Sequence, residues 1–476
     1  MKRRSDKTIN PSRIAAQRAS ASRVSKSRPG TPDIPTPVRL VQIEKPVYNG
    51  AFLARDEGKA VFVPFTLPGE EARVRLLDDR RSYATAELVE VVTSVPERIA
   101  PLCPHFGLCG GCHYQHAPNE SQLRFKQAVL REALTRGGVT PPEDIAVLSG
   151  SPWAYRNRVR LALDPRGGPA YRGRRSHSIV PIRECPITAP LLVSAAFAAA
   201  EAMRAFKLAL RPAEIALFTN AEETALLLTI FIARPAKVRF DEFALELQKR
   251  IPQLTGAELI LQSGANQPPR TVAQWGDPAL IYRAAGAEYR VDHGAFFQVN
   301  RWLVDALVER VTAGYSGALA WDLFAGVGLF ARRLALNFAK VVAVEAASAA
   351  TEALAINLKG TNGVAVRSST LEFLRENRRD ERPDLVVVDP PRTGLGANIT
   401  ALIAEIAPPA LVYVSCDPAT LARDLRVFLA AGYTIESITL ADLFPQTFHI
   451  ETVVRMRLPD RLESHRSFPA CRRDGI

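Results

Sequence analysis

The sequence predicts an α/β protein built from three parts: a small N-terminal β-barrel, a central mixed α+β part and a doubly wound parallel sheet. The chain has 476 residues, and at about 150 residues per domain this length corresponds to roughly three domains. Short alternating apolar runs fill residues 38–95, and longer β-branched runs alternate with helical ones over residues 315–457. The first pattern is typical of a barrel and the second of a doubly wound α/β sheet.

The composition excludes several classes of protein. Hydrophobic residues make up 47% of the chain and charged residues 23%, which is ordinary for a globular protein whose core folds without disulfides. The longest apolar runs, such as residues 191–200, end well before the roughly 20 residues that a membrane-spanning helix needs. Membrane, collagen-like and disulfide-scaffold classes are therefore excluded, and we expect no membrane partner.

Residues 1–37 are predicted to form a basic tail without regular structure. They are rich in Ser, Arg, Pro and Ala without periodicity, and the net charge of the whole chain is +12. Such a tail suits a polyanionic partner, because Lys and Arg displace counterions from phosphates, but a merely solvated tail explains the composition about as well. The tail shows no apolar segment typical of a secretory signal, and the six cysteines of this long chain suit a reducing compartment. We therefore expect a cytoplasmic protein.

Residues 38–95 are predicted to form the β-barrel. Turn sequences such as Asn49-Gly50 and Pro68-Gly69 separate candidate strands at residues 38–44, 59–64, 71–77 and 84–92. Frequent turns between short strands are the pattern of a small all-β barrel.

The central part, predicted at residues 96–290, contains a cluster of cysteines. Cys103, Cys109 and Cys112 lie close together with glycines between them, and Cys185 offers a fourth thiol from a distant segment. This spacing predicts a metal centre with four thiolate ligands, and four unrelated buried thiols are the alternative. Zinc and an iron–sulfur cluster both accept four thiolates, although zinc sites more often combine two close pairs than three cysteines and one.

Arginines alternate with other residues in the same part of the chain. Tyr155-Arg156-Asn157-Arg158-Val159-Arg160 and Tyr171-Arg172-Gly173-Arg174-Arg175 combine guanidinium groups with aromatic rings. This combination suits phosphate contacts and base stacking on RNA. A solvated strand face explains the first stretch nearly as well, so the residues leave both interpretations open.

The doubly wound sheet is predicted within residues 291–458, with strands at residues 319–323, 341–344, 364–367, 385–388 and 411–414. The glycine turn Phe324-Ala325-Gly326-Val327-Gly328 follows the first strand and allows the backbone to approach a ligand. Glu345 ends the next strand, near the spacing of about 20 residues expected of an acid that binds a ribose. Without a third glycine or a phosphate-binding lysine, the turn suits a nucleoside cofactor such as S-adenosylmethionine better than a dinucleotide.

Two further polar motifs end strands of this sheet. Asp389-Pro390-Pro391-Arg392 and Ser415-Cys416-Asp417-Pro418 each follow an apolar strand. Because ligands of open α/β sheets bind at the carboxyl ends of strands, both motifs are expected beside the glycine turn. Most free cysteines are buried small hydrophobes, but a cysteine at this edge is predicted to be a nucleophile.

The last motif, Phe444-Pro445-Gln446-Thr447-Phe448-His449-Ile450-Glu451-Thr452, leads into a predicted strand at residues 453–458. Glu451 is either a solvated strand residue or, when partly buried, a base whose raised pKa suits proton abstraction. Upstream, Gln298 lies near the start of an amphipathic helix that Asn300 is predicted to cap.

Together these segments, over residues 38–458, resemble the RNA uracil-5-methyltransferase family and, within it, the iron–sulfur-containing members that make 5-methyluridine in 23S rRNA. The most specific likeness lies in residues 412–418 and 444–452. The resemblance implies a class I (Rossmann-like) methyltransferase domain, a TRAM-like RNA-binding barrel, Cys416 as nucleophile and Glu451 as proton acceptor. It also implies contacts to S-adenosylmethionine from Gln298, Phe324, Glu345 and Asp389. Two positions depart from the family pattern: Ala325 replaces a cysteine of many members, and Leu329 replaces a polar cofactor contact of some.

The resemblance also favours a [4Fe–4S] cluster over zinc at the four cysteines, Cys103, Cys109, Cys112 and Cys185. The arrangement Cys-Pro-x-Phe-Gly-x-Cys-Gly-Gly-Cys is similar to the family's cluster site. Since the implied reaction has no redox step, a structural or RNA-positioning role is expected. We expect a monomer that acts on RNA, with rRNA preferred over tRNA, and a loose C-terminal tail at residues 459–476.

The implied reaction explains the residue types. Uracil C5 is too weak a nucleophile to take a methyl group, and addition of the Cys416 thiolate to C6 would create an enolate that can. Glu451 would then remove the C5 proton, and a uracil in structured RNA must leave its stack to enter the pocket. One rival is methylation of an exocyclic base nitrogen, although Arg392 stands where such enzymes usually have an aromatic residue. The other is a non-catalytic RNA-binding protein with a structural metal.

Overall fold

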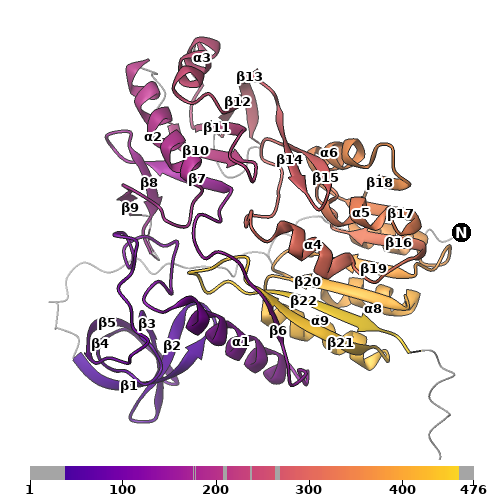
Figure 1. Cartoon of the computed structure of the whole chain (residues 1–476). Helices are drawn as coiled ribbons and strands as arrows, with labels where there is room; N and C mark the ends of the chain where they lie inside the picture. The colour runs from indigo at the N-terminus through magenta and orange to yellow at the C-terminus, as the bar shows by residue number, and fades with distance from the viewer. Residues whose placement is uncertain are drawn as a thin grey trace, which may run out of the picture.

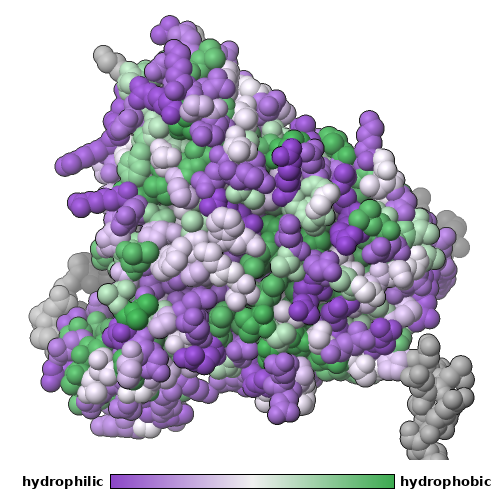
Figure 2. Space-filling view, viewed as in Figure 1, coloured by the Kyte–Doolittle hydropathy of each residue, from purple (hydrophilic) through white to green (hydrophobic). Residues whose placement is uncertain are grey.

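The computed structural model describes residues 38–459 except 175, 177, 207–211, 236–238 and 263–268. The predicted basic tail, residues 1–37, and all but the first residue of the predicted C-terminal tail lie outside the described residues. Figure 1 shows a small barrel at the lower left, a sheet with two helices above it and a larger layered sheet on the right. Among the described residues no helix has the length and apolar character that crossing a membrane requires. Figure 2 shows hydrophilic and hydrophobic residues interspersed over the face in view.

The N-terminal barrel closes around an apolar core and confirms the predicted barrel. Its strands, in the order β1-β2-β3-β5-β4, are β1 (Val38–Val47), β2 (Ala51–Asp56), β3 (Lys59–Pro64), β4 (Glu71–Asp79) and β5 (Tyr83–Thr93). Val41 and Ile43 are buried and alternate with exposed residues, as expected of a strand with one face in a core. In the predicted turn, Asn49 and Gly50 take the positive φ values, 75° and 78°, that tight hairpins need.

The central sheet is covered by helices on one face. Its strands, in the order β13-β12-β11-β10-β7-β8-β9, are β7 (Arg158–Leu163), β8 (Pro169–Arg172), β9 (Ile179–Pro181), β10 (Pro212–Thr219), β11 (Leu226–Ile232), β12 (Leu254–Leu261) and β13 (Arg270–Gly276). Helices α2 (Pro190–Ala205) and α3 (Phe240–Arg250) pack on Val159, Leu217 and Leu228. The hairpin of β14 (Ala279–Ala284) and β15 (Ala287–Asp292) joins the core of the next sheet.

The larger sheet has the order β18-β17-β16-β19-β20-β22-β21-β6, and its strands from β18 to β20 run parallel. The strands are β16 (Gly317–Leu323), β17 (Phe338–Glu345), β18 (Gly363–Arg367), β19 (Leu385–Val388), β20 (Ala410–Ser415), β21 (Thr434–Ala441) and β22 (Glu451–Arg457). The five strands predicted between residues 319 and 414 are therefore confirmed. The strand order reverses between β16 and β19, which places the expected ligand site at the carboxyl ends of these strands.

Helices cover both faces of this sheet and create two cores. They are α4 (Val304–Thr312), α5 (Leu329–Leu334), α6 (Ser348–Leu358), α7 (Thr370–Asn377), α8 (Gly396–Ile406) and α9 (Pro418–Ala430). Successive residues of β16 enter opposite cores: Ala320 packs with Leu354, whereas Trp321 packs edge-on against Phe373. This alternation holds the sheet between its two helical layers.

Two elements from within the range predicted as the central part belong to the larger sheet. Strand β6 (Ala146–Leu148) pairs in parallel with β21 at the edge of the sheet. Helix α1 (Asn119–Arg136) contributes Leu130 and Leu134 to the core shared with α9. Its Lys126 forms an ion pair with Asp442, with Nζ and Oδ1 2.6 Å apart and both side chains only 1% exposed.

Two local predictions are wrong. Asn300 does not cap α4, which begins only at Val304: its Oδ1 accepts a hydrogen bond from the Trp302 amide in the preceding turn, and its Nδ2 donates to the carbonyls of Asp442 and Leu443. Strand β22 begins at Glu451, two residues earlier than predicted, because Glu451 already pairs with Ala441 of β21. In both places tertiary partners override the local sequence pattern.

The buried Lys126–Asp442 pair yields a stability prediction. Asp442→Asn leaves the Lys126 ammonium without its counter-charge, so the free energy of unfolding should fall by about 3–5 kcal/mol, as for other broken buried pairs. Denaturant unfolding followed by circular dichroism measures this loss. The matched control is Lys45→Ala, which removes an exposed pair with Glu132 on the same helix and should cost less than about 1 kcal/mol. Equal losses in the two variants would contradict the prediction.

Candidate functional site

A cavity opens beside the glycine turn at the carboxyl end of β16. Phe324, Gly326 and Gly328 take φ values of 67°, 55° and 91°, and the turn leads directly into α5. The cavity is lined by Phe296, Phe297, Gln298, Phe324, Ala325, Gly326, Val327, Leu329, Phe330 and Asp389. Three of the four predicted cofactor residues, Gln298, Phe324 and Asp389, therefore meet at one cavity although they are far apart in sequence.

The fourth predicted cofactor residue, Glu345, contacts the glycine turn. Its Oε2 accepts a hydrogen bond from the Gly326 amide at 3.0 Å and its Oε1 accepts one from Ala347 at 2.7 Å. The carboxylate at the end of β17 thus holds the turn in place. It is not among the residues that line the cavity.

A second buried acid beneath the turn escaped the sequence analysis. Asp322 is completely buried, and its Oδ2 accepts a hydrogen bond from the Ala331 amide of α5 at 2.8 Å. Its Oδ1 has no hydrogen-bond partner in the described part of the chain. Burial, together with the charges of Asp389 and Glu345, raises the pKa of Asp322 to about 7. An acid between the apolar residues of a central strand is the signal that could have identified it.

Cys416 directly follows β20 and Glu451 begins the neighbouring strand β22, since Ser415 pairs with Thr452. Burial raises the pKa of Cys416 to about 11, with contributions from the charges of Glu451 and Asp389, while Arg392 lowers it. Burial and the charge of Asp389 raise the pKa of Glu451 well above its usual value, again opposed by Arg392. A thiol, two carboxyl groups and one guanidinium group therefore share a single electrostatic site.

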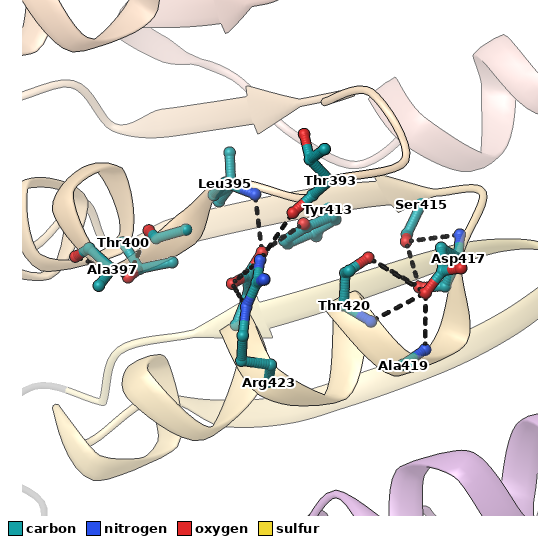
Figure 3. A network of polar contacts seen from close by, with 12 residues as sticks. Thr393, Leu395, Ala397, Thr400, Tyr413, Ser415, Asp417, Ala419, Thr420 and Arg423 are labelled. Atoms are coloured by element: carbon teal, nitrogen blue, oxygen red, sulfur yellow. Dashed lines mark hydrogen bonds and ion pairs between the residues drawn. The ribbon is translucent and has the colours of Figure 1, made fainter. Parts of the chain in front are cut away.

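Hydrogen bonds at the start of α9 fix the segment around Cys416 (Figure 3). Asp417 caps the helix, because its Oδ1 accepts hydrogen bonds from the amides of Ala419 and Thr420, both at 3.0 Å. One turn further, Asp424 accepts hydrogen bonds from the Leu395 amide and the Tyr413 hydroxyl at 2.7 and 2.9 Å. These bonds tie the turn after β19 to the end of β20.

The segment before Glu451 is held by groups from distant parts of the chain. Gln446 exchanges two hydrogen bonds with Gln122 of α1, both at 2.9 Å, and its carbonyl accepts one from the His113 amide at 2.8 Å. The Tyr155 hydroxyl donates to the carbonyl of Pro445 at 3.0 Å. The sequence analysis did not predict these contacts, since each joins segments hundreds of residues apart.

The barrel also reaches this site. The Tyr48 hydroxyl donates to Asp417 Oδ2 at 3.3 Å, and its ring lies edge-on to Phe448 at 5.8 Å between centroids. His113 packs against the same phenylalanine at 4.6 Å. His449 lies beside Phe448, and its Nδ1 is 3.0 Å from Arg392 Nη2. Aromatic rings from three segments thus surround the approach to Cys416 and Glu451.

All four predicted metal ligands line one cavity, although they come from two distant segments. Cys103, Cys109, Cys112 and Cys185 share it with Arg156 and Tyr171. Burial raises the pKa of Cys103, Cys109 and Cys112, and the charge of Cys185 adds to each shift. Within the described residues the side chains do not stand in a geometry recognised as a metal site. The structure therefore brings the four predicted thiols together at one cavity.

Comparisons with known proteins agree with this geometry. The family model described as tRNA (Uracil-5-)-methyltransferase matches residues 279–458, and that of the TRAM domain matches residues 37–89. The crystal structure of Pyrococcus abyssi tRNA (uracil-54, C5)-methyltransferase in complex with S-adenosyl-L-homocysteine superposes with a TM-score of 0.70 at 23% identity. It covers 87% of this chain and 99% of that one, so the two proteins share their fold.

Bacterial relatives are more similar in sequence. The 23S rRNA (uracil(1939)-C(5))-methyltransferase RlmD of Pectobacterium carotovorum is 34% identical over 431 residues, which cover 85% of this chain and 90% of the relative. The protein of that description from Klebsiella pneumoniae is also 34% identical and is covered over 92% of its length. The chain therefore belongs to the RNA uracil-5-methyltransferase family.

Proposed function

We propose that this enzyme methylates C5 of a uridine in 23S rRNA with S-adenosylmethionine as methyl donor. The observation that carries the proposal is the meeting of Cys416, Glu451 and Asp389 in one electrostatic site at the carboxyl edge of the sheet. The choice of 23S rRNA follows from the relatives, which are 23S rRNA (uracil(1939)-C(5))-methyltransferases and match most of the chain. A tRNA substrate, as in the Pyrococcus enzyme, is the alternative.

Four residues are proposed to hold the methyl donor: Gln298, Phe324, Glu345 and Asp389. The cavity beside the glycine turn fits a nucleoside, because it combines the rings of Phe296 and Phe324 with the carboxyl group of Asp389. Glu345 stands at the end of β17, where an acid that binds a ribose is expected. When bound, S-adenosylmethionine supplies a positively charged sulfonium whose methyl group is open to attack.

The chain's own residues account for the remaining chemistry. The Cys416 thiolate would form a bond to C6 of the uracil, and the electrons of the C5–C6 double bond would move into an enolate at O4. C5 would use that electron pair to take the methyl group, while the electrons of the methyl–sulfur bond would stay on the sulfur of the methyl donor. Glu451 would then accept the C5 proton, and the electrons of the C5–H bond would restore the double bond as the thiolate leaves.

The four cysteines are proposed to hold a [4Fe–4S] cluster, with zinc the less favoured occupant. Their thiols line one cavity in the arrangement of three plus one, and four thiols are a donor set that a cluster accepts. His113, next to Cys112, donates its amide to the Gln446 carbonyl. The cluster's proposed role is therefore structural: it would fix the cysteine segment that supports the loop before Glu451.

The two rival functions explain less of the site. Methylation of an exocyclic nitrogen gives Cys416 no role, and a non-catalytic RNA-binding protein would leave the buried acids beside the cavity without a function. An rRNA substrate and free thiols both suit the cytoplasm, where we place the enzyme. The division into parts at residues 38–95, 96–290 and 291–458, and a monomeric state, remain our proposals.

The roles of Cys416 and Glu451 can be separated with RNA that contains 5-fluorouridine. Fluorine at C5 cannot leave as a proton, so the wild-type enzyme should form a denaturation-resistant adduct with this RNA. Cys416→Ala should form none, whereas Glu451→Gln should form it and still lose about 10²–10⁴-fold in turnover on normal RNA. Gel electrophoresis and methyl-transfer assays measure both. An adduct in Cys416→Ala would exclude this cysteine as the nucleophile.

A separate experiment identifies the RNA substrate. Nucleoside mapping of rRNA and tRNA from a deletion strain would show which 5-methyluridine is lost.

The reactivity of Cys416 should depend on pH in a direction that its neighbours set. Its pKa is raised to about 11 in the free enzyme, and the thiolate is the reactive form. Alkylation of Cys416 should therefore keep rising with pH beyond the range of an ordinary cysteine. Arg392→Gln removes a charge that lowers this pKa and should shift the curve to higher pH. Glu451→Gln removes a charge that raises the pKa of Cys416 and should shift the alkylation curve to lower pH. Peptide mass spectrometry measures the extent of alkylation in both variants. If the two variants shifted the curve in the same direction, the assigned effects of Arg392 and Glu451 on Cys416 would be wrong.

Metal content tests the proposed cluster. Protein purified without oxygen should contain iron and acid-labile sulfide in about equal amounts, in keeping with a [4Fe–4S] site. Cys112→Ser and Cys185→Ser should both lose them, while Cys416→Ala should retain them. Zinc in place of iron would overturn the choice of occupant, and a metal-free wild-type protein would overturn the site itself.

A further inference from the structure

The central sheet has a second cavity on the face that α2 and α3 do not cover. Residues of β7, β10 and β11 that alternate with the helix-covered ones point to this side, where the segment 292–294 joins them. Six polar or aromatic side chains characterise a concavity of about 380 Å³: Arg158, Arg160, Phe218, Phe231, Gln262 and His293. It is separate from the cavities described above.

Arg158 is a half-buried cation without an anionic partner in this cavity. Its guanidinium lies 4.4 Å from the centroid of Phe218 and donates a 2.5 Å hydrogen bond to the carbonyl of Ala295. Among the described residues no carboxylate forms an ion pair with it. Burial lowers the pKa of Arg158 to about 10, so the side chain stays charged at neutral pH. An anionic ligand would supply the counter-charge that this burial otherwise lacks.

A second guanidinium adds to the positive charge. Arg160 lies 4.2 Å from the centroid of Phe231, and its side chain is half exposed. It shares the carboxylate of Glu214 with Arg172, at 2.6 and 2.9 Å, so two cations face one anion. Two further acids lie at or near the cavity: Asp292 is paired with Arg290, and Glu258 lies 3.9 Å from His293 Nδ1. The guanidinium groups around the cavity outnumber the carboxylates, so the surplus of positive charge favours a phosphate over a cationic ligand.

His293 offers a neutral polar edge to the same cavity. Its side chain is 6% exposed, its Nδ1 lies 2.9 Å from the Thr229 hydroxyl, and its Nε2 has no hydrogen-bond partner in the described part of the chain. Burial lowers the pKa of His293 to about 4, so the ring is neutral at physiological pH despite Glu258 at 3.9 Å. An imidazole with a free nitrogen beside the Gln262 amide suits a ligand that carries both donors and acceptors.

We propose that this cavity binds one nucleotide of the substrate RNA next to the target uridine. The phosphate would lie against Arg158 and Arg160, whose guanidinium planes also suit base stacking, and the base or ribose would reach His293. The position fits, because Gly294 lines this cavity while Gln298, four residues on, lines the cofactor cavity. When the target uridine leaves the base stack, its neighbouring nucleotides lose their stacking partner. Contacts with protein side chains at this cavity would replace that stacking. The inference rests on the proposed function.

The test measures binding of a 23S rRNA fragment that spans the target uridine, at several salt concentrations. Arg160→Ala should weaken affinity by about 10-fold, as expected for a lost charged contact, and reduce the slope of log affinity against log salt by about 0.7. Arg160→Lys should keep the slope because it keeps the charge. The matched control is Arg250→Ala on α3, which breaks a comparable surface pair with Glu246 on the helix side of the sheet and should change neither quantity.

Two results distinguish failure of this inference from failure of the proposed function. Equal affinity and salt slope in Arg160→Ala, Arg250→Ala and the wild type would overturn the nucleotide site. The 5-fluorouridine adduct would still form in that case, because Arg160 takes no part in the addition of Cys416 to C6. An adduct-free wild type would instead overturn the proposed function itself. Crosslinks from 4-thiouridine next to the target should map to the peptide that contains Phe231, and crosslinks confined to the barrel would also overturn the site.

Discussion

The position of Glu451 depends on hydrogen bonds that distant parts of the chain make to the backbone of residues 444–450. This segment joins β21 to β22 without strand pairing of its own, so its buried backbone groups need other partners. Lys126 donates to the carbonyl of Phe444, Tyr155 to that of Pro445, and the cysteine segment to that of Gln446. The segment that links the barrel to the central sheet must therefore wrap around the larger sheet, which explains why α1 and β6 are packed there.

Buried negative charge is the second constraint on the site. Burial raises the pKa of Asp322 and Asp389 to about 7, and that of Glu451 rises too. Buried carboxylates that lie close together repel one another, which raises the free energy of their charged forms. Arg392 offsets part of this repulsion near Cys416 and Glu451. A ligand with a positively charged sulfonium would lower the pKa of the nearby Asp389 and relieve the same repulsion. By linkage, a ligand that relieves this repulsion binds more tightly because it does so. The acids would therefore favour binding of the cationic methyl donor over its product, whose sulfur is neutral.

The features that could be predicted from the sequence are those that depend on hydrophobic periodicity and on the polar motifs at strand ends. The parallel strands, the barrel and the positions of Cys416 and Asp389 follow from local patterns, since a polar motif after an apolar strand lies at the ligand-binding edge. Contacts between distant segments could not be predicted in this way. The hydrogen bonds of Asn300 to the segment after β21, the hydrogen bond of Tyr48 to Asp417 and the pairing of β6 with β21 depend on tertiary packing. Asp322 is intermediate, because an acid within an apolar strand is visible in sequence but its missing partner is not.

These contacts show that all three parts of the described chain support the site around Cys416 and the glycine turn. Tyr48 of the barrel bonds to Asp417, the neighbour of Cys416, while Asn157 of the central part donates to the carbonyl of Gln298 at the cofactor cavity. RNA that binds to the barrel or to the central sheet therefore contacts parts that directly support the reacting groups. Since a thiol with a raised pKa is mostly protonated at neutral pH, these surroundings hold Cys416, the proposed nucleophile, in a weakly reactive form.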